Sequence, residues 1–294
     1  MSTAHKGFAK VLRGLLSRPL PAVALFVCVI VAVAALAAPW IAPTDPYNLA
    51  TVDIMDAQMA PGSHNLDSTV TYLLGTDGQG RDMVSAILYG LRTSLFVGVL
   101  AGGIAVSIGT LLGLIAAYYG GRVDAVIMRA VDIMLGFPTI LVALLLLAMV
   151  GQGVDKVILA LVVVQWAYYT RAVRGAALVE IGQEYIEAAH CLGLPSRRIV
   201  LGHLLPNCLP PLIVISTMQT AHAIGTEATL SFLGLGVPVT KPSLGLLIAN
   251  GSQFIMSGSY WIAFYPGLVL LIMLFSINIV GDRLLEILNP RLEK

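Results

Sequence analysis

Long stretches without a charged residue dominate this sequence, and they constrain its fold more than any other feature. Several run for roughly 18 to 25 residues, enough for an α-helix to cross the ~30 Å hydrocarbon core of a bilayer. Charged residues make up 11% of the 294 positions and hydrophobic residues 57%, whereas about 25% of a soluble domain is charged. A membrane β-barrel would instead need short alternating segments. The sequence therefore predicts an all-α integral membrane protein.

The apolar runs and the polar segments between them divide the chain into parts. Residues 1–20 form an N-terminal tail, residues 39–93 a loop after the first span, and residues 283–294 a C-terminal tail. The membrane core, residues 94–282, contains one polar loop at residues 180–207. Six transmembrane helices are expected, at residues 21–38, 94–118, 133–150, 157–178, 211–236 and 260–280.

Lysine and arginine are distributed unevenly between the two sides of this arrangement. With the N-terminus inside, all but four of the 17 fall on the inner side. The four outer ones are Arg81, Arg92, Lys156 and Lys241. Because cytoplasmic loops carry the excess of basic residues, we expect both termini in the cytoplasm.

The N-terminal apolar segment also resembles a secretory signal, with Ala35-Leu36-Ala37 as a cleavage site. Cleavage would leave five spans and an outer N-terminus. The apolar run is long for a signal core, and Pro39 would hinder processing. We therefore expect an uncleaved membrane anchor at residues 21–38.

The loop at residues 39–93 is expected on the extracytoplasmic face, where prolines and glycines break it into turns. Asp82 is placed to cap a short helix at residues 83–91. The apolar stripe of that helix consists of Val84, Ile87, Leu88 and Leu91. Such a helix suits the membrane interface, although a simple hairpin connection accounts for the segment equally well.

Motifs for enzyme chemistry or nucleotide binding are missing from the sequence. No lysine follows a glycine, so a P-loop is excluded. The metalloprotease motif and the nucleophile elbow are also missing, and the three cysteines lack metal-ligand spacing. We therefore expect no catalytic residues, no metal site and no cofactor in this chain.

Ionisable residues inside the predicted spans are few, and such residues are often functional because they are costly in hydrocarbon. Glu227 lies deepest, in the outer half of the fifth span. It is placed either to line a translocation path or to make a structural hydrogen bond to a neighbouring helix. Arg129 and Asp132, near the inner end of the third span, are spaced to pair as i, i+3 neighbours.

The polar loop at residues 180–207 is patterned as two short helices. In the first, residues 183–192, one face is formed by Tyr185, Ala188, Ala189 and Leu192. Gly193 is suited to end it. A second helix, residues 197–204, is expected to close before Pro206. The small-residue face either docks into a groove of another protein or packs on the chain's own membrane part.

This loop resembles the EAA loop of ABC importer permeases. The resemblance rests on Glu187-Ala188-Ala189, on Gly193 four residues later, and on Leu205-Pro206. In that family the loop inserts a coupling helix into a cleft of the ATPase subunit. His203 stands where the general pattern has isoleucine, a departure that suits the peptide and nickel branch. The resemblance assigns ATPase coupling to Tyr185, Glu187, Ala188, Ala189, Gly193, Arg197, Arg198, His203 and Pro206.

Further segments resemble the second permease of that branch, the DppC-type subunit of dipeptide transporters. They are residues 74–82, 89–95, 120–124, 128–132, 227–236 and 278–292, which follow in the family's order and at compatible spacing. Two positions depart from the pattern. Leu244 replaces a common tryptophan, and Asn289 replaces an aspartate.

The resemblance implies a working unit of several proteins in the bacterial cytoplasmic (inner) membrane. The partners are a homologous second permease of DppB type, two ATPase subunits that use ATP and Mg²⁺, and an extracytoplasmic solute-binding protein. ATP binding is expected to move the docked loops and switch the permeases between inward- and outward-facing states. No nucleic-acid partner is expected.

The substrate is the least determined part of this prediction. Di- and oligopeptides fit the resemblance best, and this chain would form half of their translocation pathway. Nickel complexes, glutathione and opine-like solutes are alternatives within the same branch. A secondary carrier that needs no ATPase is the alternative from another class; it would transport in liposomes alone.

Overall fold

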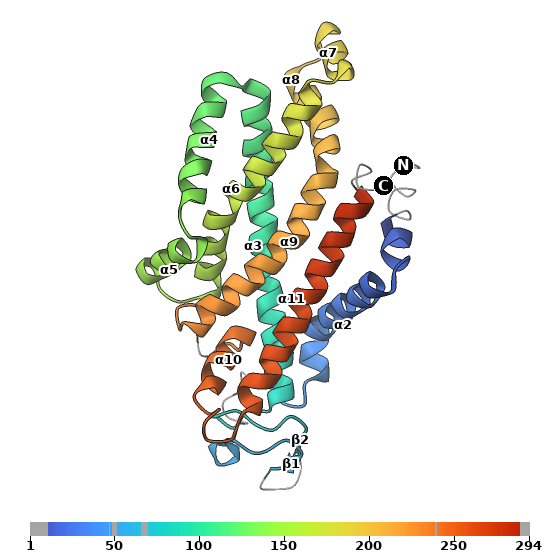
Figure 1. Cartoon of the computed structure of the whole chain (residues 1–294). Helices are drawn as coiled ribbons and strands as arrows, with labels where there is room; N and C mark the ends of the chain where they lie inside the picture. The colour runs from blue at the N-terminus through green and yellow to red at the C-terminus, as the bar shows by residue number, and fades with distance from the viewer. Residues whose placement is uncertain (1–10, 47, 49–51, 66–69, 239, 289–294) are drawn as a thin grey trace.

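Five helices in the described part of the chain are each long and apolar enough to cross a membrane. The computed structural model describes residues 11–46, 48, 52–65, 70–238 and 240–288. The five are α2 (Pro19–Ile41), α3 (Met83–Tyr119), α6 (Val154–Ile181), the continuous helical stretch Ser196–Phe232 and α11 (Trp261–Leu288). They form one bundle (Figure 1). The prediction of an all-α membrane protein is confirmed.

The predicted third span is a bent pair of helices. α4 (Gly121–Gly136) and α5 (Thr139–Val150) meet at 90°, and counting them as one span gives the sixth. Phe137 between them is extended, with φ −100° and ψ 146°. The ring of Pro138 disfavours a helical conformation at the residue before it, which explains the break.

The predicted interfacial helix at residues 83–91 is the beginning of α3. That helix has 37 residues, or about 55 Å, longer than a bilayer core. Asp82 caps it as expected, because its carboxylate accepts a 2.8 Å hydrogen bond from the Ser85 backbone N–H. Met83 and Ala86 are fully buried, so this stretch packs inside the protein, and a hairpin connection is also ruled out.

α3 and α6 pack with their backbones in close approach. A Cβ atom at Gly109 would lie 2.4 Å from the Tyr169 Cβ and 2.7 Å from the Trp166 carbonyl oxygen. At Gly113 it would lie 2.8 Å from the Thr170 carbonyl oxygen. Small residues at such crossings let membrane helices gain van der Waals contact without side chains between them.

Loops cover the end of the bundle at which α3 begins; we call it the β1 end. They include a 3-10 turn, η1 (Ile54–Asp56), and two short antiparallel strands, β1 (Ser63–His64) and β2 (Thr71–Tyr72). The Trp261 indole N–H donates a 3.2 Å hydrogen bond to the Thr76 carbonyl oxygen. This contact ties the loops to the start of α11.

Two polar contacts hold these loops together internally. Arg81 Nε and Asp77 Oδ2 form a 2.7 Å ion pair that is almost fully buried. The Tyr72 hydroxyl donates a 2.8 Å hydrogen bond to Asp56 Oδ2. Burial, reinforced by the Asp56 carboxylate, raises the pKa of Tyr72 to about 12.

A short helix that was not predicted from the sequence, α10 (Leu244–Ser252), lies between α9 (Leu205–Phe232) and α11. The Ser243 hydroxyl accepts a 3.2 Å hydrogen bond from the Leu246 N–H and so caps it. Leu244, one of the departures from the family pattern, is fully buried. Asn289, the other departure, lies outside the described residues.

Candidate functional site

A short helix, α7 (Glu184–Cys191), projects from the end of the bundle opposite to β1 (Figure 1). We call this end the α7 end; α2 begins there and α11 ends there. Gly193 has φ +66°, a conformation that glycine adopts without the strain of a side chain. The Leu194 N–H then donates a 3.2 Å hydrogen bond to the Ala189 carbonyl oxygen, which closes the helix. The predicted first helix and its glycine stop are thus present.

The two sides of α7 have different surroundings. Ile186 and Ala189 are 1% and 4% exposed and pack on the chain's own helices. Tyr185, Ala188 and Leu192 point to the outside, and Leu192 is 79% exposed. The expected face is therefore divided, because Ala189 turns inward while the other three side chains are exposed. The inner side thus packs on the chain's own membrane part, whereas docking of the outer side to another protein stays a prediction.

The second part of the loop differs from its prediction. α8 (Ser196–Ile199) carries exposed Arg197 and Arg198. A π-helical turn, η2 (Val200–Leu204), follows it and joins α9 without a break, so the helix does not close before Pro206. Proline lacks the N–H of a regular helical hydrogen bond, and Pro206 is accommodated in the first turn of α9, directly after the π-helical turn. π-Helical turns inside α-helices are frequent at functional sites.

Hydrogen bonds fasten α7 to the two membrane helices beside it. The Tyr185 hydroxyl donates to Glu180 Oε2 of α6 at 2.5 Å. Asn207 Nδ2 of α9 donates to the Tyr185 hydroxyl at 2.8 Å and to the His203 carbonyl oxygen at 2.9 Å. Partial burial and the Glu180 carboxylate raise the pKa of Tyr185, so its hydroxyl keeps the proton that it donates.

An aromatic contact adds a third attachment. The rings of Tyr118, near the end of α3, and His190 of α7 are stacked with their centroids 5.9 Å apart. α7 is thereby joined to α3, α6 and α9. Asn207 was not among the predicted coupling residues, although it directly follows the Leu205-Pro206 pair of the family motif.

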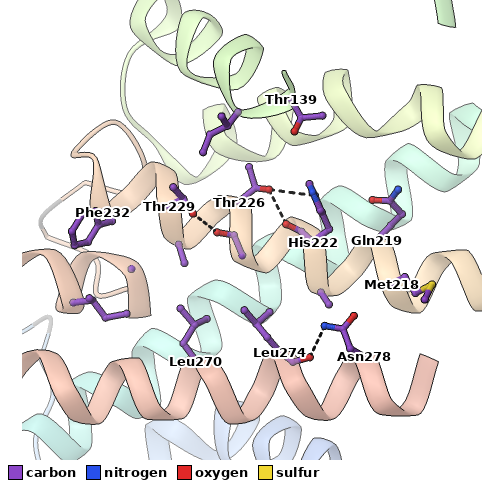
Figure 2. A pocket seen from close by; sticks show the side chains of 16 residues that line it. Thr139, Met218, Gln219, His222, Thr226, Thr229, Phe232, Leu270, Leu274 and Asn278 are labelled. Atoms are coloured by element: carbon purple, nitrogen blue, oxygen red, sulfur yellow. Dashed lines mark hydrogen bonds between the residues drawn. The ribbon is translucent and has the colours of Figure 1, made fainter. Parts of the chain in front are cut away.

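A cavity of about 880 Å³ opens at the surface of the bundle among α5, α9, α10 and α11. Four polar residues of α9 line it at helical spacing, namely Gln219, His222, Thr226 and Thr229. Figure 2 shows His222 and Thr226 on the side of α9 that faces Thr139, and Asn278 on α11. Of the described residues that line the cavity, none is Asp, Glu, Lys or Arg.

Backbone carbonyl groups of α9 accept hydrogen bonds from some of these polar side chains. The Thr226 hydroxyl donates to the His222 carbonyl oxygen and the Thr229 hydroxyl to the Gly225 carbonyl oxygen, both at 2.8 Å. Each hydroxyl oxygen keeps acceptor capacity for a ligand. This row was not predicted to be a site, although polar residues at positions 219, 222, 226 and 229 of an apolar span are a signal visible in the sequence.

Comparison with known proteins decides the family of the chain. The family described as "Binding-protein-dependent transport system inner membrane component" matches residues 109–294. The chain belongs to this family. The matched range contains α7, α8 and every residue that lines the cavity.

Several curated members of the family are similar over most of their length. The di/tripeptide transport system permease protein DppC of Pseudomonas aeruginosa (strain UCBPP-PA14) is 36% identical over 259 residues, 88% of this chain and 84% of its own length. The dipeptide transport system permease protein DppC of Escherichia coli (strain K12) is 39% identical over 272 residues, 92% and 89% of the two chains. The DppC protein of Bacillus subtilis (strain 168) is 38% identical over 230 residues, 78% and 72%.

Solved structures confirm the fold. A chain of the MetNI methionine ABC transporter, in an inward-facing conformation, aligns with a TM-score of 0.58 at 23% identity. The alignment covers 70% of this chain and 98% of the other. At this identity the likeness establishes the common helical architecture.

Glu227, the residue predicted either to line a path or to bridge helices, is fully buried between α3 and α9. Its two carboxylate oxygens each accept a 2.7 Å hydrogen bond, one from the Ser94 hydroxyl of α3 and one from the Ser231 hydroxyl of α9. It is not among the residues that line the cavity, whereas its neighbours Thr226 and Ala228 are. This geometry is that of a structural bridge.

Two ion pairs join α4 to α6. Arg174 Nε and Nη2 donate to the two carboxylate oxygens of Asp124 at 2.5 and 2.6 Å. Asp132 pairs with Arg171 of α6, so the predicted pairing with Arg129 on its own helix is wrong. α4 leans along α6 (Figure 1), which brings the Arg171 guanidinium within reach of Asp132.

Proposed function

We propose that this chain is the permease subunit of an ABC importer for di- and oligopeptides, with the exposed side of α7 as its docking surface for an ATPase subunit. The observation that carries the proposal is the divided helix α7, in a chain of this transport family. One side of it is exposed, and contacts of Tyr185 and His190 attach the helix to α3, α6 and α9. The curated relatives named above are dipeptide or di/tripeptide permeases.

The orientation proposed is with the α7 end and both termini in the cytoplasm of a bacterial cell. Basic residues support it, because they are enriched on the cytoplasmic side of membrane proteins. Those in α4, in the second half of α6 and in α8 are Arg122, Arg129, Arg171, Arg174, Arg197 and Arg198. In this orientation the loops at the β1 end face the solute-binding protein.

Coupling in this account is mechanical. A displacement of α7 by an ATPase subunit passes through Tyr185 and Asn207 to α9. α9 carries the polar row that lines the cavity, so the same rigid movement changes the cavity wall. Bistable packed elements transmit such shifts, whereas a loose loop would dissipate them. Tyr185, Glu187, Ala188 and Leu192 would then contact the ATPase, while Ala189 holds α7 in place.

The cavity is suited to uncharged polar recognition. Its volume lies in the range of small-ligand sites, and amide and hydroxyl groups can exchange hydrogen bonds with a peptide backbone of any sequence. A homologous second permease would supply the opposite wall. ATP and Mg²⁺ would act on the ATPase partners, and this chain would bind no cofactor.

The proposal is tested with the complete complex in proteoliposomes. Gly193→Ala strains a position that requires φ +66°, and Glu187→Ala removes an exposed carboxylate of α7. Both variants should insert and assemble, but peptide-stimulated ATP hydrolysis and uptake should fall several-fold. Unchanged coupling in both variants would contradict the proposal. Peptide uptake by this chain alone, without ATPase subunits, would identify a secondary carrier instead.

A further inference from the structure

A second groove lies on the bundle surface between α2 and α3, apart from the cavity described above. It has a volume of about 980 Å³. Its wall is almost entirely apolar, with Leu36, Phe96 and Val99 exposed along it. In a soluble protein such a surface would promote aggregation, whereas in a membrane it is open to lipid.

The groove has basic residues at one end and none along its length. Arg92 of α3 and Lys241, from the segment between α9 and α10, both line it and are both exposed. Within the described residues, neither takes part in an ion pair. Val154, at the start of α6, lies at the same groove, and these chain positions place its basic end toward the β1 end of the bundle.

The length of the apolar part matches half a bilayer. From Arg92 to Ile104, the last groove residue on α3, an α-helix rises about 18 Å. One leaflet of the hydrocarbon core is about 15 Å thick. A ligand with an anionic head at Arg92 and Lys241 and an acyl chain along Phe96, Val99 and Ile104 would fit this pattern of charge and apolar surface.

We infer that this groove binds an anionic phospholipid, with its phosphate at Arg92 and Lys241 and an acyl chain between α2 and α3. In the orientation proposed above, the lipid belongs to the outer leaflet. Two cations near an anionic headgroup should strengthen its binding about 30-fold over a zwitterionic lipid. The groove is distinct from the cavity of α9, so the inference does not depend on which solute is transported.

The experiment measures lipid bound to the intact complex by native mass spectrometry. The complex is purified in detergent and titrated with phosphatidylglycerol or phosphatidylcholine. Wild type should retain phosphatidylglycerol preferentially. R92Q/K241Q should lose that preference by about 30-fold, and R92K/K241R should keep it to within a few-fold. K156Q is the matched control, because Lys156 is a basic residue two positions from Val154 that does not line the groove.

A second variant tests the acyl-chain part without changing charge. A Cβ atom at Gly103 would meet no other atom within 4 Å, so Gly103→Trp should fold and fill the groove. It should reduce phosphatidylglycerol retention although both basic residues remain. Equal retention by wild type, R92Q/K241Q and Gly103→Trp would overturn the inference. If these variants instead dissociated the second permease from the complex, the groove would be a protein interface, and the inference would be overturned too.

Discussion

The hydroxyl of Tyr185 is the smallest group whose removal should separate ATP hydrolysis from transport. It connects Glu180 of α6 with Asn207 of α9 through hydrogen bonds of 2.5 and 2.8 Å. Tyr185→Phe keeps the ring, and therefore the outward surface of α7, but removes both bonds. The predicted effect is thus on the fastening of α7 and not on docking.

The size of the effect follows from the two bonds. A hydrogen bond to a charged group contributes about 1.5–3 kcal/mol and a neutral one about 0.5–1.5 kcal/mol. Tyr185 is 40% exposed, so hydrogen bonds to water replace part of the lost stabilisation. The net free-energy cost of removing the hydroxyl is therefore about 1 kcal/mol. That corresponds to roughly a fivefold shift toward an unfastened α7.

The assay is peptide uptake per ATP hydrolysed by the complete complex in proteoliposomes. Tyr185→Phe should lower this ratio about fivefold while basal ATP hydrolysis persists. Asn207→Ala should act similarly, and the double variant should be less than additive because both residues share one network. Tyr119→Phe is the control, as Tyr119 is 65% exposed at the same end of the bundle. An unchanged ratio in both single variants would refute the proposed mechanical coupling of α7 to α9.

Three further predictions concern stability. Burial raises the pKa of Tyr72 from 10.0 to about 12. The stabilisation by its protonated hydroxyl is therefore complete below pH 10 and lost as the pH rises toward 12. The melting-temperature difference between wild type and Tyr72→Phe should shrink over that range. Glu227→Leu leaves two buried serine hydroxyls without their acceptor and should destabilise the complex by about 1–3 kcal/mol, whereas loss of transport at unchanged stability would place Glu227 in the pathway. Gly109→Val drives a side chain into Tyr169 and should prevent assembly, as judged by size-exclusion chromatography, while Gly175→Ala on α6 meets open space and should not.

Local patterns in the sequence were sufficient for the parts of the fold that depend on composition and short-range geometry. The apolar runs predicted the spans, Asp82 was correctly placed as a helix cap, and Gly193 ends α7 with the positive φ that glycine permits. The break at Phe137–Pro138 was missed, although a proline in an apolar run is a local signal.

Tertiary contacts decided the features that the sequence did not predict. Pro206 signals a helix end, yet packing continues the helix through a π-helical turn. The face of α7 was expected to include Ala189, but contacts with the membrane helices bury Ala189 together with Ile186. The cavity joins four separate helices, so no single segment contains it. Only the polar row of α9 is visible in one stretch of sequence.

Docking of an ATPase subunit on the outer side of α7 is tested most directly at Leu192, which is 79% exposed. Leu192→Cys is made in a chain whose own three cysteines are replaced by serine, and its reaction with a bulky maleimide is timed. The thiol should react readily in the isolated chain and be protected in the assembled complex, and a short bifunctional maleimide should link it to the ATPase subunit. Equal reactivity in both states, with full transport after labelling, would contradict the account.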